Sequence, residues 1–220
     1  ASYVAQHPHL RLQIPGRFGF MPLLSIQEFK ADAVIGMFAS PEEARPYQER
    51  GMLVLNASGL TDQVHPWVHI NDRRIGEIAA NGLCSYGFRN FVYVGFSDIA
   101  DSSEVNEGLF SRTRRSGFKD RLQLSGLDCQ TLLLKRRPFY QLSGWQRGLQ
   151  QLAKRLAALP RPLGVFCVND NAAGLVTMAC RQAGLHIPEE VGIIGTDNDP
   201  LVCHAVDPSL SSIEMDSARL

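Results

Sequence analysis

Short apolar runs alternate with longer amphipathic segments along the whole chain. The clearest runs are Phe91–Phe96 and Val191–Gly195, which are apolar at nearly every position. Strands covered by helices on both faces have this pattern, because neither face of such a strand meets water. The same reasoning predicts further strands at Leu10–Ile14, Ala33–Phe38, Met52–Leu55, Trp67–Ile70, Cys129–Leu134, Gly164–Val168 and Leu210–Ile213.

Three amphipathic segments between these runs predict helices. Asp72–Tyr86 carries apolar residues at spacings of three and four, and Gly87 follows it directly. Gln146–Leu159 repeats the spacing, and a third such segment, Ala172–Ala183, is again followed by a glycine. Glycine after a helix is typical of a left-handed stop. The regular alternation of strands and helices predicts an α/β fold with doubly wound parallel sheets.

A polar and acidic stretch, Ser97–Glu107, follows one of the strongest predicted strands. We interpret it as a crossing between two doubly wound lobes with a ligand cleft between them. The first lobe is then expected to contain residues 1–96 together with 213–220, and the second lobe residues 97–212.

Composition narrows the classes of function. The chain has 22 basic and 22 acidic side chains, so it has no net field to hold a phosphate backbone and is a poor candidate for a DNA-contacting part. Its five cysteines are far apart, form no C-x-x-C pair and lie mostly in apolar runs, which indicates reduced thiols in a cytoplasmic protein. No apolar run is long enough to span a membrane, so no membrane partner is expected.

Motifs for catalysis, cofactors and metals are missing from the sequence. There is no phosphate-binding glycine loop, no G-x-S-x-G elbow and no cysteine in a nucleophile motif. His7 and His9 form only a weak metal signal, and His65 and His69 flank a proline and cannot share a helical face. The sequence therefore predicts a binding protein rather than an enzyme, without cofactor or metal.

Polar residues follow three of the predicted strands. Asn71 comes after Trp67–Ile70, Asn169 after Gly164–Val168, and Asp197 after Val191–Gly195. Ligands of open α/β sheets bind at the carboxyl ends of the strands, so three polar groups at that edge suggest a polar pocket. Each residue has a simpler interpretation as the cap of the next helix.

An arginine and an aromatic ring would complete a sugar site. Carboxylates, amides and arginine satisfy hydroxyl groups, and an aromatic ring covers the apolar face of a pyranose. The arginine could come from the basic cluster Arg112–Arg115 and the ring from Trp145. On composition alone, that cluster is more typical of a solvated helix face, and Trp145 of a core residue.

The segment 162–216 resembles the effector domain of the LacI/GalR regulators and of the related periplasmic sugar-binding proteins. Upstream, Gly76, Gly87–Asn90 and Ser116–Phe118 fall where that family has its own versions. The residues that carry the resemblance are Gly164–Asp170, Gly184–Val191, Gly195–Asn198 and Asp207–Ile213. Asp197–Cys203 and the Leu-Pro-Arg-Pro lead-in are most similar to AraC-family regulators of xylose operons, which attach a LacI-type sensor to C-terminal helix-turn-helix motifs.

The resemblance implies a set of ligand-binding residues. Arg114 lies three residues before Gly117, the position at which the family has its sugar-binding arginine. Asn71 stands where an aspartate is common, so either the sugar differs or Asp72 contributes. The complete implied set is Asn71, Arg114, Trp145, Asn169 and Asp197.

The resemblance also implies a function. The cleft would bind a monosaccharide effector, with xylose as the first candidate, and control transcription as part of a homodimer in the cytoplasm. DNA would be bound by a part outside this sequence, and the first strand of the first lobe would also be missing. A periplasmic sugar-binding protein of a transport system is the alternative, since fold does not determine function.

Overall fold

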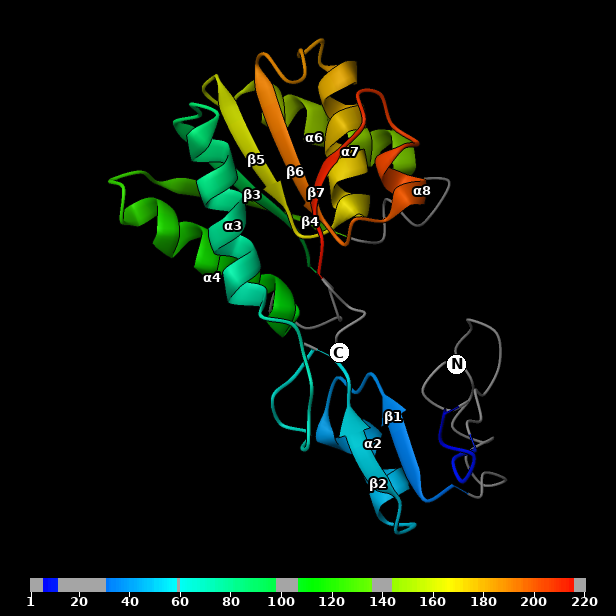
Figure 1. The fold of residues 1–220 in the computed structure, drawn as a ribbon. Coiled ribbons are helices and arrows are strands. Elements are labelled where there is room, and N and C mark those ends of the chain that lie inside the picture. Colours follow the sequence, from blue (N-terminus) through cyan, green and yellow to red (C-terminus); the bar gives the residue numbers. More distant parts are fainter. Residues whose placement is uncertain (1–5, 12–30, 59, 98–106, 136–143, 216–220) are drawn as a thin grey trace.

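The computed structural model describes residues 6–11, 31–58, 60–97, 107–135 and 144–215. They form two parallel sheets that lie at opposite ends of the molecule (Figure 1). The smaller sheet pairs β1 (Ala33–Gly36) with β2 (Leu53–Asn56), and α2 (Pro41–Gln48) connects them. The parallel α/β class predicted from the sequence is confirmed.

The larger sheet has five parallel strands in the order β4-β3-β5-β6-β7. Parallel neighbours need a crossover, and helices supply it. Helices α3 and α4 pack against one another on one face of this sheet, and α6 and α7 on the other (Figure 1). The strands are β3 (Asn90–Ser97), β4 (Cys129–Lys135), β5 (Leu163–Cys167), β6 (Val191–Thr196) and β7 (Ser211–Ile213). The helices are α3 (Asp72–Ser85), α4 (Leu109–Gln123), α6 (Trp145–Ala157), α7 (Asp170–Gln182) and the short α8 (Pro200–Cys203).

Most of the predicted elements agree with the structure to within one or two residues. Gly87 and Gly184 have φ angles of 88° and 71°, so both adopt the left-handed conformation expected after α3 and α7. The prediction of a strand at Trp67–Ile70 is wrong: Trp67 forms only an isolated bridge to Asn56. Part of the predicted strand Leu10–Ile14 lies outside the described residues.

A core of aromatic and aliphatic residues fills the five-stranded region. Tyr93, Phe118 and Phe166 are fully buried. The ring of Phe166 lies 5.5 Å from that of Tyr93 and 5.1 Å from that of Phe118, within the range of favourable ring contacts. The Tyr93 hydroxyl donates a 2.9 Å hydrogen bond to the carbonyl oxygen of Ser111 in α4, which satisfies the polar end of this buried side chain.

Two glycines allow α3 and α4 to touch backbone to backbone. A Cβ atom at Gly76 would overlap the carbonyl oxygen of Arg114, and one at Gly117 would overlap that of Arg73. Because neither glycine has a side chain, the backbones of the two helices come into direct contact. This close crossing places the side chain of Arg114 beside the beginning of α3.

The structure corrects the expected lobe boundaries, 1–96 plus 213–220 and 97–212. Strand β3 lies inside the five-stranded sheet, between β4 and β5, and α3 packs on α4 of the same region. Ile213 also belongs to this sheet, through β7, whereas residues 216–220 lie outside the described part. Trp67 still bridges to Asn56 of β2, and α3 begins at Asp72, so the chain passes between the two regions just before α3 rather than at 97. The sequence could not show this, because a strand–helix pattern does not say which sheet a strand joins.

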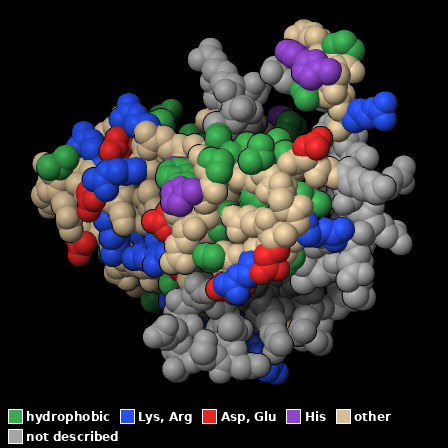
Figure 2. Space-filling view, turned by 90° about the horizontal axis from the view of Figure 1, so that it is seen from below, with side chains coloured by type: hydrophobic (Ala, Val, Ile, Leu, Met, Phe, Trp, Pro, Cys, Tyr) green, Lys and Arg blue, Asp and Glu red, His purple; other side chains and the backbone are tan. Residues whose placement is uncertain are grey.

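The two-stranded region has a small core of its own. Phe38, Ala44, Val54 and Val64 are buried together between α2 and one face of β1 and β2. The opposite face stays open and exposes Ile35, Met37 and Leu53. Figure 2 views the molecule from the end that carries this sheet, and hydrophobic side chains gather on the face that it shows.

Neither a membrane-spanning helix nor a metal-binding cluster of His, Cys, Asp or Glu is found among the residues that the structure describes.

Candidate functional site

A cleft of about 480 Å³ lies between the two sheets, a size typical of small-molecule sites. The wall formed by the five-stranded region is polar, and the wall formed by the two-stranded region is mainly apolar. The polar wall contains Asp72, Arg114, Asn169 and Asp197, with Phe110 and Met215 beside them. The other wall contains Ile35, Met37, Leu55, Ala57, Ser58 and Leu60.

Arg114 is the central group of the polar wall, although it is only 5% exposed. Its Nε donates a 2.8 Å hydrogen bond to Oδ1 of Asp72, and its Nη1 donates a 2.6 Å bond to the carbonyl oxygen of Val168. Its guanidinium carbon lies 5.3 Å from the centre of the Phe110 ring, within cation–π range. These contacts hold the guanidinium in one orientation before any ligand arrives.

Asp72 begins α3 and forms a buried ion pair with Arg114. Burial raises the pKa of the Asp72 carboxyl, and the charge of Arg114 and its hydrogen bond oppose that shift. The resemblance implied that Asn71 lines the cleft and left open whether Asp72 contributes. The structure places Asp72 there.

Asp197 projects from the turn after β6. It adopts a φ of 110°, and the next residue, Asn198, a φ of 50°, so two consecutive non-glycine residues are left-handed. Its Oδ1 lies 3.9 Å from Nη1 of Arg114, too far for a hydrogen bond. Burial raises the pKa of Asp197 to about 6, Arg114 opposes this, and the carboxylates of Asp170, Asp199 and Asp72 add to it.

The two predicted asparagines have different positions. Asn169 caps α7 by accepting a 2.9 Å hydrogen bond from the amide of Ala172, and it also lines the cleft. Asn71 caps α3 by accepting a 3.0 Å bond from the amide of Arg74, but it is exposed and does not line the cleft. For Asn71 the simpler interpretation as a helix cap describes its contacts.

Trp145 is not among the residues that line the cleft. It is the first residue of α6 and is partly buried against the core of the five-stranded region. The structure therefore brings Arg114, Asn169 and Asp197 together, with Asp72 in addition, and leaves Asn71 and Trp145 outside the cleft wall.

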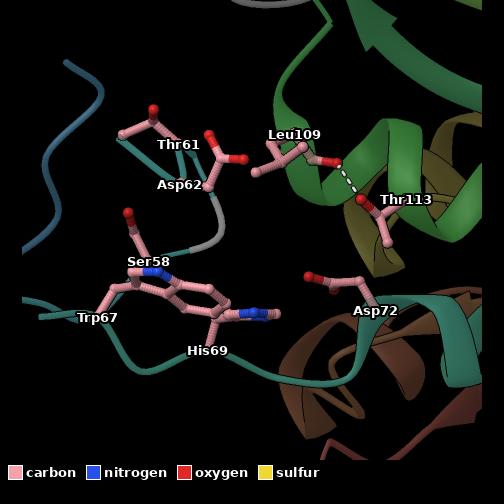
Figure 3. Close-up of a pocket in the computed structure, with 8 residues that line it drawn as sticks. All are labelled: Ser58, Thr61, Asp62, Trp67, His69, Asp72, Leu109 and Thr113. Atoms are coloured by element: carbon pink, nitrogen blue, oxygen red, sulfur yellow. Dashed lines mark hydrogen bonds between the residues drawn. The ribbon is translucent and has the colours of Figure 1, made fainter. Parts of the chain in front are cut away.

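An aromatic pair that was not predicted from the sequence lies at the side of the cleft. The rings of Trp67 and His69 stack with centres 4.0 Å apart and planes 25° apart. They form one side of a small recess of about 40 Å³ that shares Ser58, His69 and Asp72 with the cleft. Figure 3 shows Asp62 and Asp72 beside this recess, with the two rings below. The available signal was their spacing, since residues two apart in an extended segment face the same side.

Comparison with known proteins assigns the family. Residues 80–220 match the model of the periplasmic binding protein-like domain. The chain belongs to this family.

Relatives with curated names are transcription regulators. The chain is 23% identical over 202 residues to the xylose operon regulatory protein of Haemophilus influenzae, covering 89% of this chain and 50% of that protein. It is 30% identical over 141 residues to the HTH-type transcriptional regulator DegA of Bacillus subtilis, covering 64% of this chain and 38% of that protein. The chain thus spans half or less of these relatives.

A solved structure shows the same fold. The periplasmic binding protein/LacI transcriptional regulator from Alkaliphilus metalliredigens, complexed with D-xylulofuranose, superimposes with a TM-score of 0.65. The match covers 88% of this chain and 66% of that one, at 20% sequence identity. This likeness confirms the type of fold expected for LacI-type effector domains.

Proposed function

We propose that this chain is the sugar-sensing domain of a LacI-type transcription regulator and that it binds a monosaccharide in the cleft between its two sheets. The observation that carries the proposal is the contrast between the two walls of the cleft. One wall offers an arginine, two carboxylates and an amide, and the other offers mainly aliphatic side chains. A sugar ring has the same two characters, hydroxyl groups at its edge and C–H groups on its faces.

Three polar groups of the cleft have roles that their geometry supports. Asp197 is partly exposed and accepts from sugar hydroxyls, while the fixed guanidinium of Arg114 donates to a sugar oxygen. Asn169 supplies an amide that both donates and accepts. Ile35 and Met37 cover the apolar face of the ring, and the stacked pair of Trp67 and His69 extends this cover at the side.

The relatives supply the biological setting of the proposal. Their names describe a xylose operon regulator and a helix-turn-helix regulator, so sugar binding here would control transcription through a DNA-binding part outside this sequence. Xylose is the first candidate ligand. The comparisons favour a LacI-type arrangement over the AraC-type attachment expected from the sequence, and we limit the proposal to the former. A homodimer fits the two-fold symmetry of most operators.

The cysteines support a cytoplasmic rather than a periplasmic protein. All five are free, and Cys129, Cys167, Cys180 and Cys203 are buried in the structure. Buried free thiols are typical of reducing compartments. Of the two sugar-binding alternatives, this observation favours the regulator over the transport component.

The signal would come from closure of the two walls on the sugar. A ligand shifts a conformational equilibrium only by the difference in its affinity for the two states. A sugar that contacts Asp197 on one wall and Met37 on the other binds the closed state better. Coupling of about 1–3 kcal/mol then changes DNA affinity by about 5- to 150-fold.

A thermal-shift screen with D-xylose, L-arabinose, D-ribose, D-glucose and D-galactose tests the proposal. A sugar at about 100 times its dissociation constant stabilises the protein by about 2.7 kcal/mol, which raises the melting temperature by several degrees. Asp197→Ala should abolish that shift while the protein remains folded. Glu189→Ala is the matched control, because Glu189 is exposed and lies before β6, at the opposite end of the strand. Folded wild-type protein that responds to none of the sugars would contradict the proposal.

A further inference from the structure

Asp170 is a buried carboxylate directly beside the cleft that takes no part in lining it. It is 1% exposed and lies in the first turn of α7, next to the cap residue Asn169. Its Oδ1 accepts a 2.6 Å hydrogen bond from the Ser212 hydroxyl. Its Oδ2 accepts a 2.8 Å bond from the amide of Asp199 and a 3.4 Å contact from the Cys203 thiol.

These donors come from the two segments that surround Asp197. Asp199 lies in the same turn, two residues further on, and Ser212 lies in β7, which pairs with β6 alongside it. The Ser212 hydroxyl also accepts a 3.0 Å bond from the amide of Asn198. The amide of Asp197 in turn donates a 3.2 Å bond to the carbonyl oxygen of Ile213. One carboxylate thus connects the ligand-facing turn with the last strand of the sheet.

The turn needs such support because its backbone is unfavourable. Asp197 and Asn198 both have positive φ angles, a conformation that residues with a side chain adopt only rarely. Backbone of this kind persists only when the surroundings fix it, and it is common at ligand sites. The hydrogen bonds of Asp170 and Ser212 fix the amides of Asp199 and Asn198.

A simpler explanation for Asp170 is that an acidic residue suits the first turn of any helix. That explanation does not account for burial, nor for three donors from other elements. The neighbouring strand also leaves room for this carboxylate, since a Cβ atom at Gly195 would overlap Oδ1 of Asp170. The turn after β6, β7, α8 and Gly195 therefore all surround the Asp170 carboxylate.

We infer that Asp170 is a positioning residue for ligand binding: it fixes the turn from Asp197 to Asp199 against β7, so that the Asp197 carboxylate is held beside Arg114 on the polar wall of the cleft. The inference rests on the proposed function, because it assigns Asp197 to the ligand. The hydrogen bonds of Ser212 to Asp170 and to the amide of Asn198 also connect β7 to this turn. Met215, two residues beyond β7, returns to the cleft and contacts Nη2 of Arg114.

Isothermal titration with D-xylose, or with the sugar that gives the largest shift in the screen, tests the inference. Asp170→Asn and Ser212→Ala should each weaken binding by about tenfold, the effect of losing a hydrogen bond to a charged group. Thr177→Val is the matched control on the same helix. It removes a buried hydroxyl that donates only to Ala173 of α7, so it lowers stability without moving the turn.

Two further measurements separate positioning from a purely structural role. In Asp170→Asn and Ser212→Ala, the amides of Asn198 and Asp199 should exchange hydrogen faster, while those in the middle of α7 keep their rates. The pH dependence of binding should also shift to lower pH in Asp170→Asn. The charges facing Asp197 are Arg114, Asp170, Asp199 and Asp72, and removing one carboxylate lowers the pKa of Asp197.

The possible outcomes distinguish this inference from the proposed function. If the wild type binds sugar and both variants bind within about twofold of it, the positioning role is wrong. If the wild type binds no sugar, the proposed function fails, and the exchange rates at Asn198 and Asp199 alone decide the role of Asp170. If Asp170→Asn does not fold, Ser212→Ala carries the test, because Ser212 is only partly buried.

Discussion

The two regions of this protein contribute different things to the cleft between them. The five-stranded sheet has helices on both faces, and its central residues Val92, Tyr93 and Phe166 are fully buried. The two-stranded sheet is covered on one face by a cluster of four buried residues, and its other face exposes Ile35 and Met37. Groups that need a fixed direction, such as the Arg114 guanidinium, come from the densely packed region. Groups that need only to exclude water come from the other.

The largest expected effect comes from truncating one buried aromatic residue in each region. Phe166→Ala should lower the free energy of unfolding of the five-stranded region by about 4 kcal/mol, because a fully buried ring leaves a cavity there. Phe38→Ala should cost the two-stranded region less than half as much, since its core is small.

Urea unfolding followed by tryptophan fluorescence measures both values. Trp145 reports on the five-stranded region and Trp67, which bridges to Asn56 of β2, on the other. Trp67→Phe and Trp145→Phe backgrounds separate the two signals. Equal losses for the two phenylalanine variants would mean that the regions do not differ in packing as described.

A smaller effect is expected from closing the space between α3 and α4. Gly76→Val should lower the free energy of unfolding by about 3 kcal/mol, because the new side chain meets the backbone of Arg114 and cannot be accommodated by a rotamer change. Gly51→Ala is the control in the two-stranded region. Gly51 has a φ of 78° and open space around it, so the cost there is only the backbone strain of about 1 kcal/mol. A Gly76→Val cost no greater than that of Gly51→Ala would contradict the close crossing.

The smallest effect concerns pH and should arise on the polar wall only. The pKa of Asp197 is raised from 3.8 to about 6 in the folded protein, so the proton is held more tightly when the chain is folded. The resulting stability is complete below about pH 4 and is lost as the pH rises through about 6. About a third of this side chain is exposed, so we expect only about 1 kcal/mol between pH 5 and 7.

Urea unfolding at these two pH values checks the effect. Asp197→Asn should reduce the difference but not remove it, because burial raises the pKa of Asp72 in the same direction. The two carboxylates that line the cleft, Asp72 and Asp197, both belong to the polar wall, so the difference is expected to arise in the five-stranded region. A wild type that becomes more stable as the pH rises would show that the sign is wrong.

Features that depend on local pattern could be predicted from the sequence. β3 and β6 were predictable because strands covered on both faces are apolar at nearly every position. α7 was predictable from its spacing and from Gly184, and Asn169 from its place between a strand and a helix. In each case, neighbouring residues determine the structure.

Features that depend on the pairing of distant segments could not be predicted. The sequence does not say that β3 joins the same sheet as β6, nor that Asp72 rather than Asn71 meets Arg114, 42 residues away. Asn71 caps α3, so its side chain turns back to the helix amides, and Asp72 is the residue whose side chain is free to meet Arg114. The packing of α3 on α4 then decides which of its neighbours reaches the cleft.

The contact between Gly76 and the backbone of Arg114 also has a consequence for adapting the protein as a biosensor. The residue proposed to grip the ligand is set in place by the spacing of two helices, and Gly76 and Gly117 that set this spacing do not line the cleft. A small side chain introduced at either glycine would shift Arg114 without changing any group offered to the sugar. Because Arg114 is proposed to donate to the sugar, such variants would alter the concentration at which the sensor responds.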